Sequence, residues 1–247
     1  RTDRSRIKKV TSTLPRVIDT DSRRVVGVEA LLRWDHPTRG PVSPYDLIRL
    51  AERSGAIVPL GLEVFTRACD QAGAWHRAGH DLSVAINVSG RQLREPGFVD
   101  EVRRAIDAAG IAPARVLVEL TETVLATGEH GELTSLNRLR ELGCLVALDD
   151  FGTGYSSLSG LRDLPIDVVK LDQSFISDLD TSRQAVAMVD AVVRLADALD
   201  LVVVAEGVET EQQLATLQRL GCHRFQGFAF SRPLSPDAVT RLLDRSG

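Results

Sequence analysis

The chain has 247 residues, of which 43% are hydrophobic and 26% are charged, a composition typical of a soluble globular protein. This length is close to the roughly 250 residues of a single (β/α)8 barrel and is long enough to bury a large core. The net charge of −4, without a basic block beyond the first nine residues, argues against a nucleic-acid polymer as partner. Three cysteines lie far apart, so neither a disulfide framework nor a zinc cluster is expected.

The sequence bears on the cellular location and on the extent of the domain. No apolar run approaches the ~20 residues that cross a bilayer, and no signal peptide is visible, so we expect a cytoplasmic domain without membrane contact of its own. The chain begins with Arg rather than Met, which is consistent with a piece of a larger, even membrane-tethered, protein. We expect residues 1–16 to be an irregular or truncated leader and residues 17–247 to form one domain.

Short β-branched runs alternate with longer helical patterns along the chain. The runs predict strands over residues 16–19, 25–32, 84–88, 116–120, 145–148, 168–171, 202–205 and 224–227. The helical patterns cover residues 44–54, 61–78, 97–109, 129–142, 182–199, 210–220 and 235–244. The first strand is irregular and is expected to pair with residues 25–32 across the turn at 20–24. This alternation predicts an α/β fold, a TIM-like (β/α)8 barrel with a mostly parallel sheet.

Polar side chains interrupt the strands near their carboxyl ends. Buried strands of a parallel barrel are usually continuous runs of Val, Ile and Leu. Here the interruptions are Glu29, Asn87, Glu119, Asp149 with Asp150, Lys170, Glu206 and Gln226. One such residue can be a capped or solvent-facing group, but seven strands that repeat the pattern predict an active site at the barrel mouth.

The residue types indicate the chemistry of this site. Oxygen ligands without His or Cys favour Mg²⁺ or Mn²⁺, and two such ions can bind a phosphodiester and activate a water molecule. Lys170 could hold that water, meet phosphoryl charge, or form only a structural ion pair. Glu206 could be a metal ligand or a general base. Arg33 is either a phosphate-binding group or an exposed side chain without a role.

The two adjacent acids lead directly into a glycine-bearing loop, Gly152-Thr153-Gly154-Tyr155-Ser156-Ser157-Leu158. Adjacent carboxylates at a strand end are costly unless cations or protons neutralise them. The motif therefore indicates a site that closes over a substrate; the alternative is an acidic turn.

These motifs closely resemble the EAL domain family, the bacterial cyclic di-GMP phosphodiesterases. The resemblance covers roughly residues 17 to 243. In order, the blocks are Glu29-Ala30-Leu31, Asn87-Val88-Ser89, Glu119-Leu120-Thr121-Glu122, Asp149-Asp150-Phe151-Gly152, Val169-Lys170-Leu171-Asp172, Ala205-Glu206-Gly207-Val208-Glu209 and Gln226-Gly227-Phe228.

The resemblance implies a barrel with one antiparallel strand that hydrolyses cyclic di-GMP to linear pGpG. It implies two metal ions, with Glu29, Asn87, Glu119 and Asp149 as ligands of one and Asp150 serving the other. Lys170 would contact the attacking water, and Glu206 would be an essential carboxylate.

Further roles follow from the same resemblance. Leu32 and Arg33 would contact the dinucleotide, and Gln226 would lie beside the metals and the water. Glu122 would anchor the loop at 150–158, which the family ties to a homodimer, and Glu209 would support the site.

The chain departs from the family in its first strand, which usually carries a Gln that reaches the substrate. Ungapped alignment puts Pro15 at that position, and a shift of one residue puts Leu14 there, so the amide is absent either way. A lost hydrogen bond of this kind weakens binding by about 10- to 100-fold.

Two alternatives to an active phosphodiesterase stay open, and the departure in the first strand supports only the first of them. One is a catalytically weak or inactive EAL domain that serves as a cyclic di-GMP receptor or a protein-interaction module. The other is an unrelated metal-dependent barrel, such as an isomerase or a Schiff-base aldolase that uses Lys170.

Overall fold

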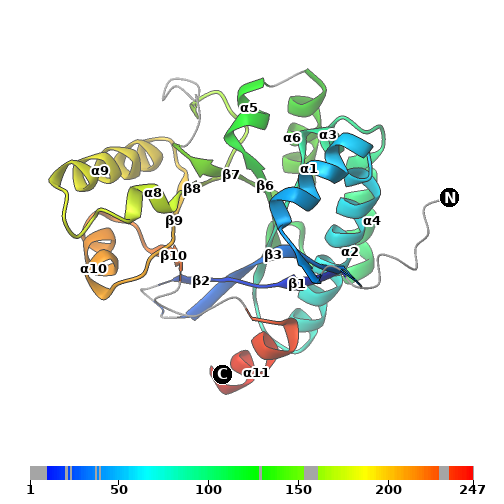
Figure 1. Cartoon of the computed structure of the whole chain (residues 1–247), viewed down its shortest axis with the longest axis horizontal. Helices are drawn as coiled ribbons and strands as arrows, with labels where there is room; N and C mark the ends of the chain where they lie inside the picture. Colours follow the sequence, from blue (N-terminus) through cyan, green and yellow to red (C-terminus); the bar gives the residue numbers. More distant parts are fainter. Residues whose placement is uncertain are drawn as a thin grey trace.

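The computed structural model describes residues 10–19, 22, 24–36, 38, 40–127, 130–152, 161–227 and 234–246. Its centre is a closed ring of strands surrounded by helices (Figure 1). In neighbour order the ring consists of β3 (Arg24–His36), β2 (Arg16–Asp19), β10 (Arg224–Gln226), β9 (Val202–Glu206), β8 (Val168–Leu171), β7 (Leu145–Phe151), β6 (Val116–Thr121) and β5 (Ser83–Asn87). Pairing of β5 with β3 closes the ring. The predicted barrel is confirmed.

The barrel contains one strand of opposite direction. β2 is antiparallel to β3 and to β10, while the other neighbours in the ring run parallel. The expected pairing of residues 16–19 with the next strand is therefore confirmed. Residues 20, 21 and 23 of the expected turn lie outside the described residues.

β3 is longer than the expected 25–32 because two short strands outside the ring extend its pairing. β1 (Val10–Thr13) and β4 (Gly40–Val42) both pair antiparallel with β3 beyond the barrel. Residues 10–13 thus form a strand within the segment that we expected to be irregular. The boundary of the domain at residue 17 stays a prediction.

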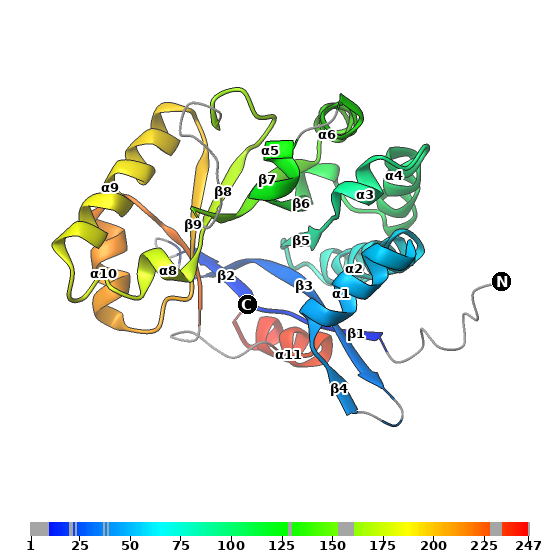
Figure 2. The same ribbon diagram turned by 45° about the horizontal axis from the view of Figure 1, so that its top comes forward.

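Helices cover the outside of the ring, with α8–α10 on one side and α2, α4 and α6 on the other (Figures 1 and 2). They are α1 (Pro44–Ser54), α2 (Ile57–Arg77), α3 (Gly90–Leu93), α4 (Phe98–Ala109), α5 (Glu122–Thr127), α6 (His130–Leu142), α8 (Gln173–Ile176), α9 (Arg183–Ala198), α10 (Glu211–Arg219) and α11 (Pro236–Ser246), with a 3-10 turn at Pro113–Arg115. Within the described ranges, none of them has the length and apolar character needed to cross a bilayer.

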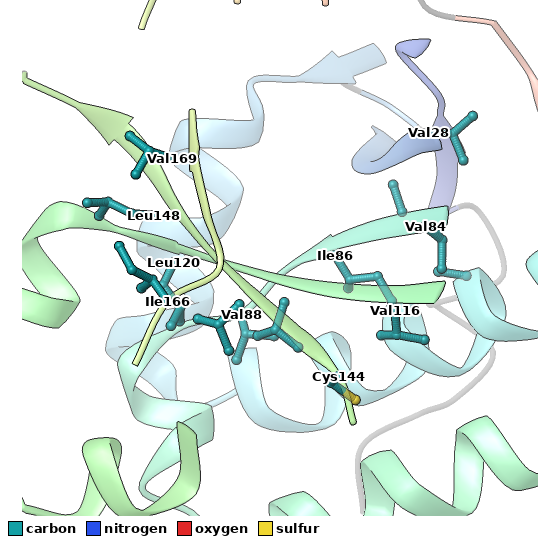
Figure 3. Close-up of a cluster of buried hydrophobic side chains, with 14 of the residues drawn as sticks. Val28, Val84, Ile86, Val88, Val116, Leu120, Cys144, Leu148, Ile166 and Val169 are labelled. Carbon is teal, nitrogen blue, oxygen red and sulfur yellow. The ribbon is translucent and has the colours of Figure 1, made fainter. Parts of the chain in front are cut away.

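The apolar side chains form two cores, because successive strand residues point to opposite faces. The larger core fills the space between strands and helices, and Figure 3 shows part of it, including Val28, Ile86, Leu120 and Val169. The smaller core lies inside the barrel and consists of Ala147, Val168 and Val204, with Val17, Leu117 and Val202 packed against them. The inner core supports whatever lies above it at the barrel mouth.

Candidate active site

The polar residues of the strands form the layer directly above the inner core. Four of them lie two residues after a residue of the inner core, so they point into the barrel from the same strand face. This relation links Leu117 to Glu119, Ala147 to Asp149, Val168 to Lys170 and Val204 to Glu206. The strand register brings neighbours level, as in the pairs Asn87–Glu119 and Gln226–Glu206. The predicted clustering at the carboxyl ends of the strands is what the structure describes.

Lys170 occupies the centre of this layer and is 2% exposed. Its Nζ lies 2.8 Å from Glu206 Oε1, 2.9 Å from Asp149 Oδ1, 3.0 Å from Glu119 Oε1 and 3.7 Å from Glu29 Oε2. Burial alone would lower the pKa of Lys170, but the surrounding carboxylates raise the pKa well above its ordinary value. The surrounding carboxylates therefore favour the charged form of Lys170.

Two amide side chains orient Glu29. Asn87 donates from Nδ2 to Glu29 Oε1 at 2.8 Å and to Glu119 Oε2 at 3.3 Å. Gln226 donates from Nε2 to Glu29 Oε2 at 2.8 Å. Burial tends to raise the pKa of Glu29, yet Lys170 and these hydrogen bonds together hold the pKa below its usual value. Glu29 is therefore held as a carboxylate.

The other acids are less well compensated. Burial raises the pKa of Glu119 well above its usual range, and raises the pKa of Glu206 to about 7. Burial and the neighbouring Asp149 also raise the pKa of Asp150. One lysine is therefore not enough positive charge for this layer, and its acids favour additional cations or protons.

An irregularity in β7 lets two consecutive acids share the site. The pairing of β7 with β8 shifts register between Leu148 and Phe151, and Asp150 has a left-handed backbone with φ of 54°. Such a bulge turns a side chain away from the alternating pattern. As a result, oxygens of Asp149, Asp150 and Glu206 lie within 4.8 Å of one another.

The donor set fits hard divalent cations. Carboxylate oxygens form two groups, each within 4.8 Å: Glu29, Glu119 and Asp149 in one, and Asp149, Asp150 and Glu206 in the other. The Gln226 Oε1 atom is buried and, among the described residues, has no hydrogen-bond partner, so it is a further oxygen that can ligate a cation. Mg²⁺ and Mn²⁺ prefer ligands of this kind.

A cavity of about 300 Å³ opens beside these groups. Glu29, Asn87 and Asp149 line one part of it, and Leu32 and Arg33 lie along it. Arg33 folds back so that Nη1 donates to the carbonyl of Leu32 at 2.9 Å. The part of the wall on α1 and α2 is largely apolar and includes Pro44, Ile48, Ile57, Leu60 and Val64, with Glu52 beside them. A ligand with a charged and an apolar part suits such a cavity.

Glu122 and Glu209 lie outside the cluster of acids. Glu122 is buried, and its Oε2 accepts the backbone N–H of Gly152 at 3.2 Å, which ties α5 to the end of β7. Residues 153–158 of the expected loop lie outside the described residues. Glu209 is exposed and accepts from Gln173 Nε2 at 3.4 Å, so its contact is with α8.

Sequence reasoning missed several residues around the site. The apolar cavity wall on α1 and α2 has the spacing of ordinary helix core positions, so nothing in the sequence distinguishes it. Gln92 on α3 lines the cavity and forms a capping box with Ser89. The pattern Ser-x-x-Gln was the available signal for that short helix.

Comparison with known proteins identifies the family. The family model named EAL domain matches residues 14–233. The chain belongs to the EAL domain family. The cyclic di-GMP phosphodiesterase NbdA of Pseudomonas aeruginosa is 46% identical over 217 residues, which are 87% of this chain and 28% of NbdA. The curated relatives that it matches are longer, and the chain spans 26% to 39% of their length.

Solved EAL structures share the fold. A structure named PaMucR phosphodiesterase, c-di-GMP complex, is 38% identical, covers 94% of each chain and has a TM-score of 0.87. Klebsiella pneumoniae BlrP1, in a complex with manganese and c-di-GMP, is 35% identical over 92% of this chain and 57% of its own, with a TM-score of 0.81.

The departure of this EAL domain in the first strand has a clear structural setting. The carbonyl of Pro15 accepts the N–H of Glu29 at 3.1 Å, and Arg16 pairs with Val28, so residue 15 lies opposite Glu29. Leu14 instead is 3% exposed and belongs to the outer core. Of the two alignments, the structure favours the one that places Pro15 at the position of the family Gln.

Proposed function

We propose that this EAL domain is a metal-dependent phosphodiesterase that hydrolyses cyclic di-GMP to linear pGpG. The observation that carries the proposal is the complete layer of acids around Lys170 at the barrel mouth, beside a cavity with a polar and an apolar end. Similarity to proteins named as cyclic di-GMP phosphodiesterases supports the choice of substrate.

Two divalent cations, Mg²⁺ or Mn²⁺, complete the site in this proposal. Glu29, Asn87, Glu119 and Asp149 hold one, and Asp150 serves the other together with Asp149 and Glu206. Such metal ions would supply a Lewis acid that lowers the pKa of a water molecule and stabilises the leaving oxygen. The manganese named for BlrP1 supports this metal class.

In this proposal Lys170 and Glu206 act on the attacking water and on the proton that this water loses. Lys170 keeps its proton and can donate hydrogen bonds to the attacking water or to a phosphoryl oxygen. Glu206 lies 2.8 Å from Lys170 Nζ, and the carboxylate oxygen that does not serve the cation can accept the proton that the water loses. Gln226 holds Glu29 through one end of its amide and leaves Oε1 for the water or a cation.

The substrate lies along the cavity in this proposal. Arg33 and Leu32 contact the dinucleotide, and the apolar wall on α1 and α2 receives a nucleobase. Glu122 fixes the start of the following loop through Gly152, and Glu209 supports the site through α8. We also propose a homodimer and a cytoplasmic location, as part of a longer signalling protein.

The test is turnover of micromolar cyclic di-GMP with Mn²⁺ or Mg²⁺, followed by chromatography of the product. The parent should form pGpG, and Glu206→Gln should lower the rate by at least about 100-fold, as is typical when a general base is lost. Glu211→Gln, an exposed acid at the start of α10, is the matched control and should keep the parent rate. Binding without turnover would indicate a receptor. If the parent showed no binding and no turnover, the proposal would be contradicted.

A further inference from the structure

The short helix α8 directly follows β8, the strand that carries Lys170. It begins three residues after Lys170, and Asp172 caps it by accepting the N–H of Ser174 at 2.9 Å. Its last residue, Ile176, is completely buried and belongs to the outer core. Figures 1 and 2 show α8 beside the carboxyl end of β8. A helix of four residues has little stability of its own, so packing and the cap fix its place.

Phe175 packs α8 against the end of β7. Gly152 has φ of 96°, and a Cβ added there would fall on the Cε2 and Cζ atoms of the Phe175 ring. The ring therefore occupies the space that any other side chain at Gly152 would need. Glu122 holds the same residue through its backbone N–H. Gly152 is thus fixed from two sides, two residues after Asp150.

Gln173 makes the equivalent contact with the end of β9. Gly207 has φ of 68°, and a Cβ added there would lie 2.5 Å from Gln173 Cγ and 2.6 Å from Gln173 Cβ. The side-chain amide then continues to Glu209. Gly207 directly follows Glu206, so the methylene groups of Gln173 fix the backbone on which that carboxylate stands.

Both glycines follow members of one acidic group. Asp149, Asp150 and Glu206 form this group, and they come from the strands on either side of β8. Glu29 and Glu119 belong to the other group and come from strands that α8 does not support through these contacts. We infer that α8 is a positioning element for the Asp149–Asp150–Glu206 cation site, with Phe175 and Gln173 as positioning residues.

The inference rests on the proposed function only in that these acids bind a divalent cation. Three carboxylates hold a cation tightly only when their oxygens are kept near the ligand geometry. Loss of the Phe175 ring would free the backbone at Gly152, and loss of the Gln173 methylenes would free it at Gly207. Both changes should loosen the same cation.

The test is a Mn²⁺ titration of the whole chain by calorimetry, with no substrate present. The parent should bind two ions. Phe175→Leu and Gln173→Ala should each weaken one of them by about tenfold, equivalent to ~1.4 kcal/mol. The other ion should keep its affinity within about twofold, because a loss confined to one of two sites distinguishes positioning from general destabilisation.

Matched substitutions provide the controls. Phe98→Leu truncates a ring on α4 that is buried, whereas Phe175 is partly buried, and Gln184→Ala removes another exposed amide, on α9; neither should change Mn²⁺ binding. Gln173→Met keeps the methylenes without the amide and should restore the affinity.

The outcomes separate this inference from the proposed function. Two ions with unchanged affinities in Phe175→Leu and Gln173→Ala, equal losses at both sites, or a single ion in the parent would each overturn the inference. A parent that binds two ions but does not hydrolyse cyclic di-GMP would contradict the proposed function and leave the positioning role intact.

Discussion

Asp150 combines an uncommon backbone with a carboxylate that belongs to an acidic group of the candidate site. Its φ of 54° lies in the left-handed region, which costs most L-residues about 1–2 kcal/mol but is easier for Asp and Asn. Substitution at this position therefore affects both the backbone and the site.

We expect Asp150→Ala to unfold more easily than Asp150→Asn in metal-free protein, by about 1 kcal/mol. Urea denaturation with a chelator present measures the difference. Both variants remove the carboxylate that we propose for the second cation, so both should turn over cyclic di-GMP more slowly than the parent. Equal stability of the two variants would mean that the backbone at this position relaxes.

Lys170 provides the positive charge among the buried acids in the absence of metal. Lys170→Met should destabilise the metal-free protein by about 3–5 kcal/mol, because it leaves buried carboxylates without their partner. Arg194→Met is the control, since Arg194 pairs with Asp190 in solvent and should contribute less than about 1 kcal/mol. Chemical denaturation measures the free energy of unfolding of both variants. Similar losses of stability in the two would contradict the role of Lys170.

Pro15 provides a third residue-scale prediction. Pro15→Gln places an amide opposite Glu29, which lines the cavity, and a new hydrogen bond to the substrate should lower KM for cyclic di-GMP by about tenfold. The value of kcat should stay within a factor of two or so of the parent. Pro15→Ala, which removes the ring without adding an amide, should leave KM unchanged; an equal effect of both would point to backbone freedom.

Helix packing sets the limits at the scale of elements. Gly73 of α2 lies against α4 so closely that a Cβ added there would collide with the backbone oxygen of Ala109. Gly131 of α6 has no atom near the equivalent position. The same substitution should therefore act in opposite directions at the two sites.

We expect Gly73→Ala to destabilise the protein by about 1–3 kcal/mol through overpacking. Gly131→Ala should be neutral or stabilise it by up to about 1 kcal/mol, because alanine favours helix. Denaturant midpoints compared with the parent measure both effects. Stabilisation by both substitutions would show that α2 and α4 can separate at little cost.

The elements also show where sequence reasoning succeeded and where it stopped. The alternation of short β-branched runs with longer helical patterns predicted the barrel and its main helices, because buried strands and amphipathic helices each have a characteristic pattern of apolar residues. The predicted start of a helix at residue 61 was wrong, since α2 begins at Ile57 and runs through Gly61. That glycine is tolerated because Gln92 occupies the space of a Cβ.

The candidate site was predictable for a similar reason. Glu29, Asn87 and Glu206 stand out because each interrupts an apolar strand. The apolar wall of the cavity, the helix α8 and its two glycine contacts were not predictable, because they join segments far apart in the chain. A one-turn helix also has too few residues to show a period.

At the scale of the whole molecule, cations should stabilise the fold. Five carboxylates of one end of the barrel share one lysine, so ligands that neutralise them favour the folded state. Mn²⁺ at 100 times its Kd should add about 2.7 kcal/mol, which raises Tm by several degrees. Thermal unfolding with Mn²⁺ and with chelator measures the shift. Asp149→Asn should lose most of it, and an undiminished shift would place the ion elsewhere.

Asp149 is a member of both acidic groups. A single carboxylate that serves two cations has one negative charge to share between them, so occupancy of either position reduces its attraction for the other. We therefore expect negative cooperativity between the two ions: the first should bind tightly and the second more weakly, so that the whole titration extends over a broad range of concentration. If the domain hydrolyses cyclic di-GMP as proposed, its rate in a cell would then follow the free divalent metal as well as the cyclic di-GMP.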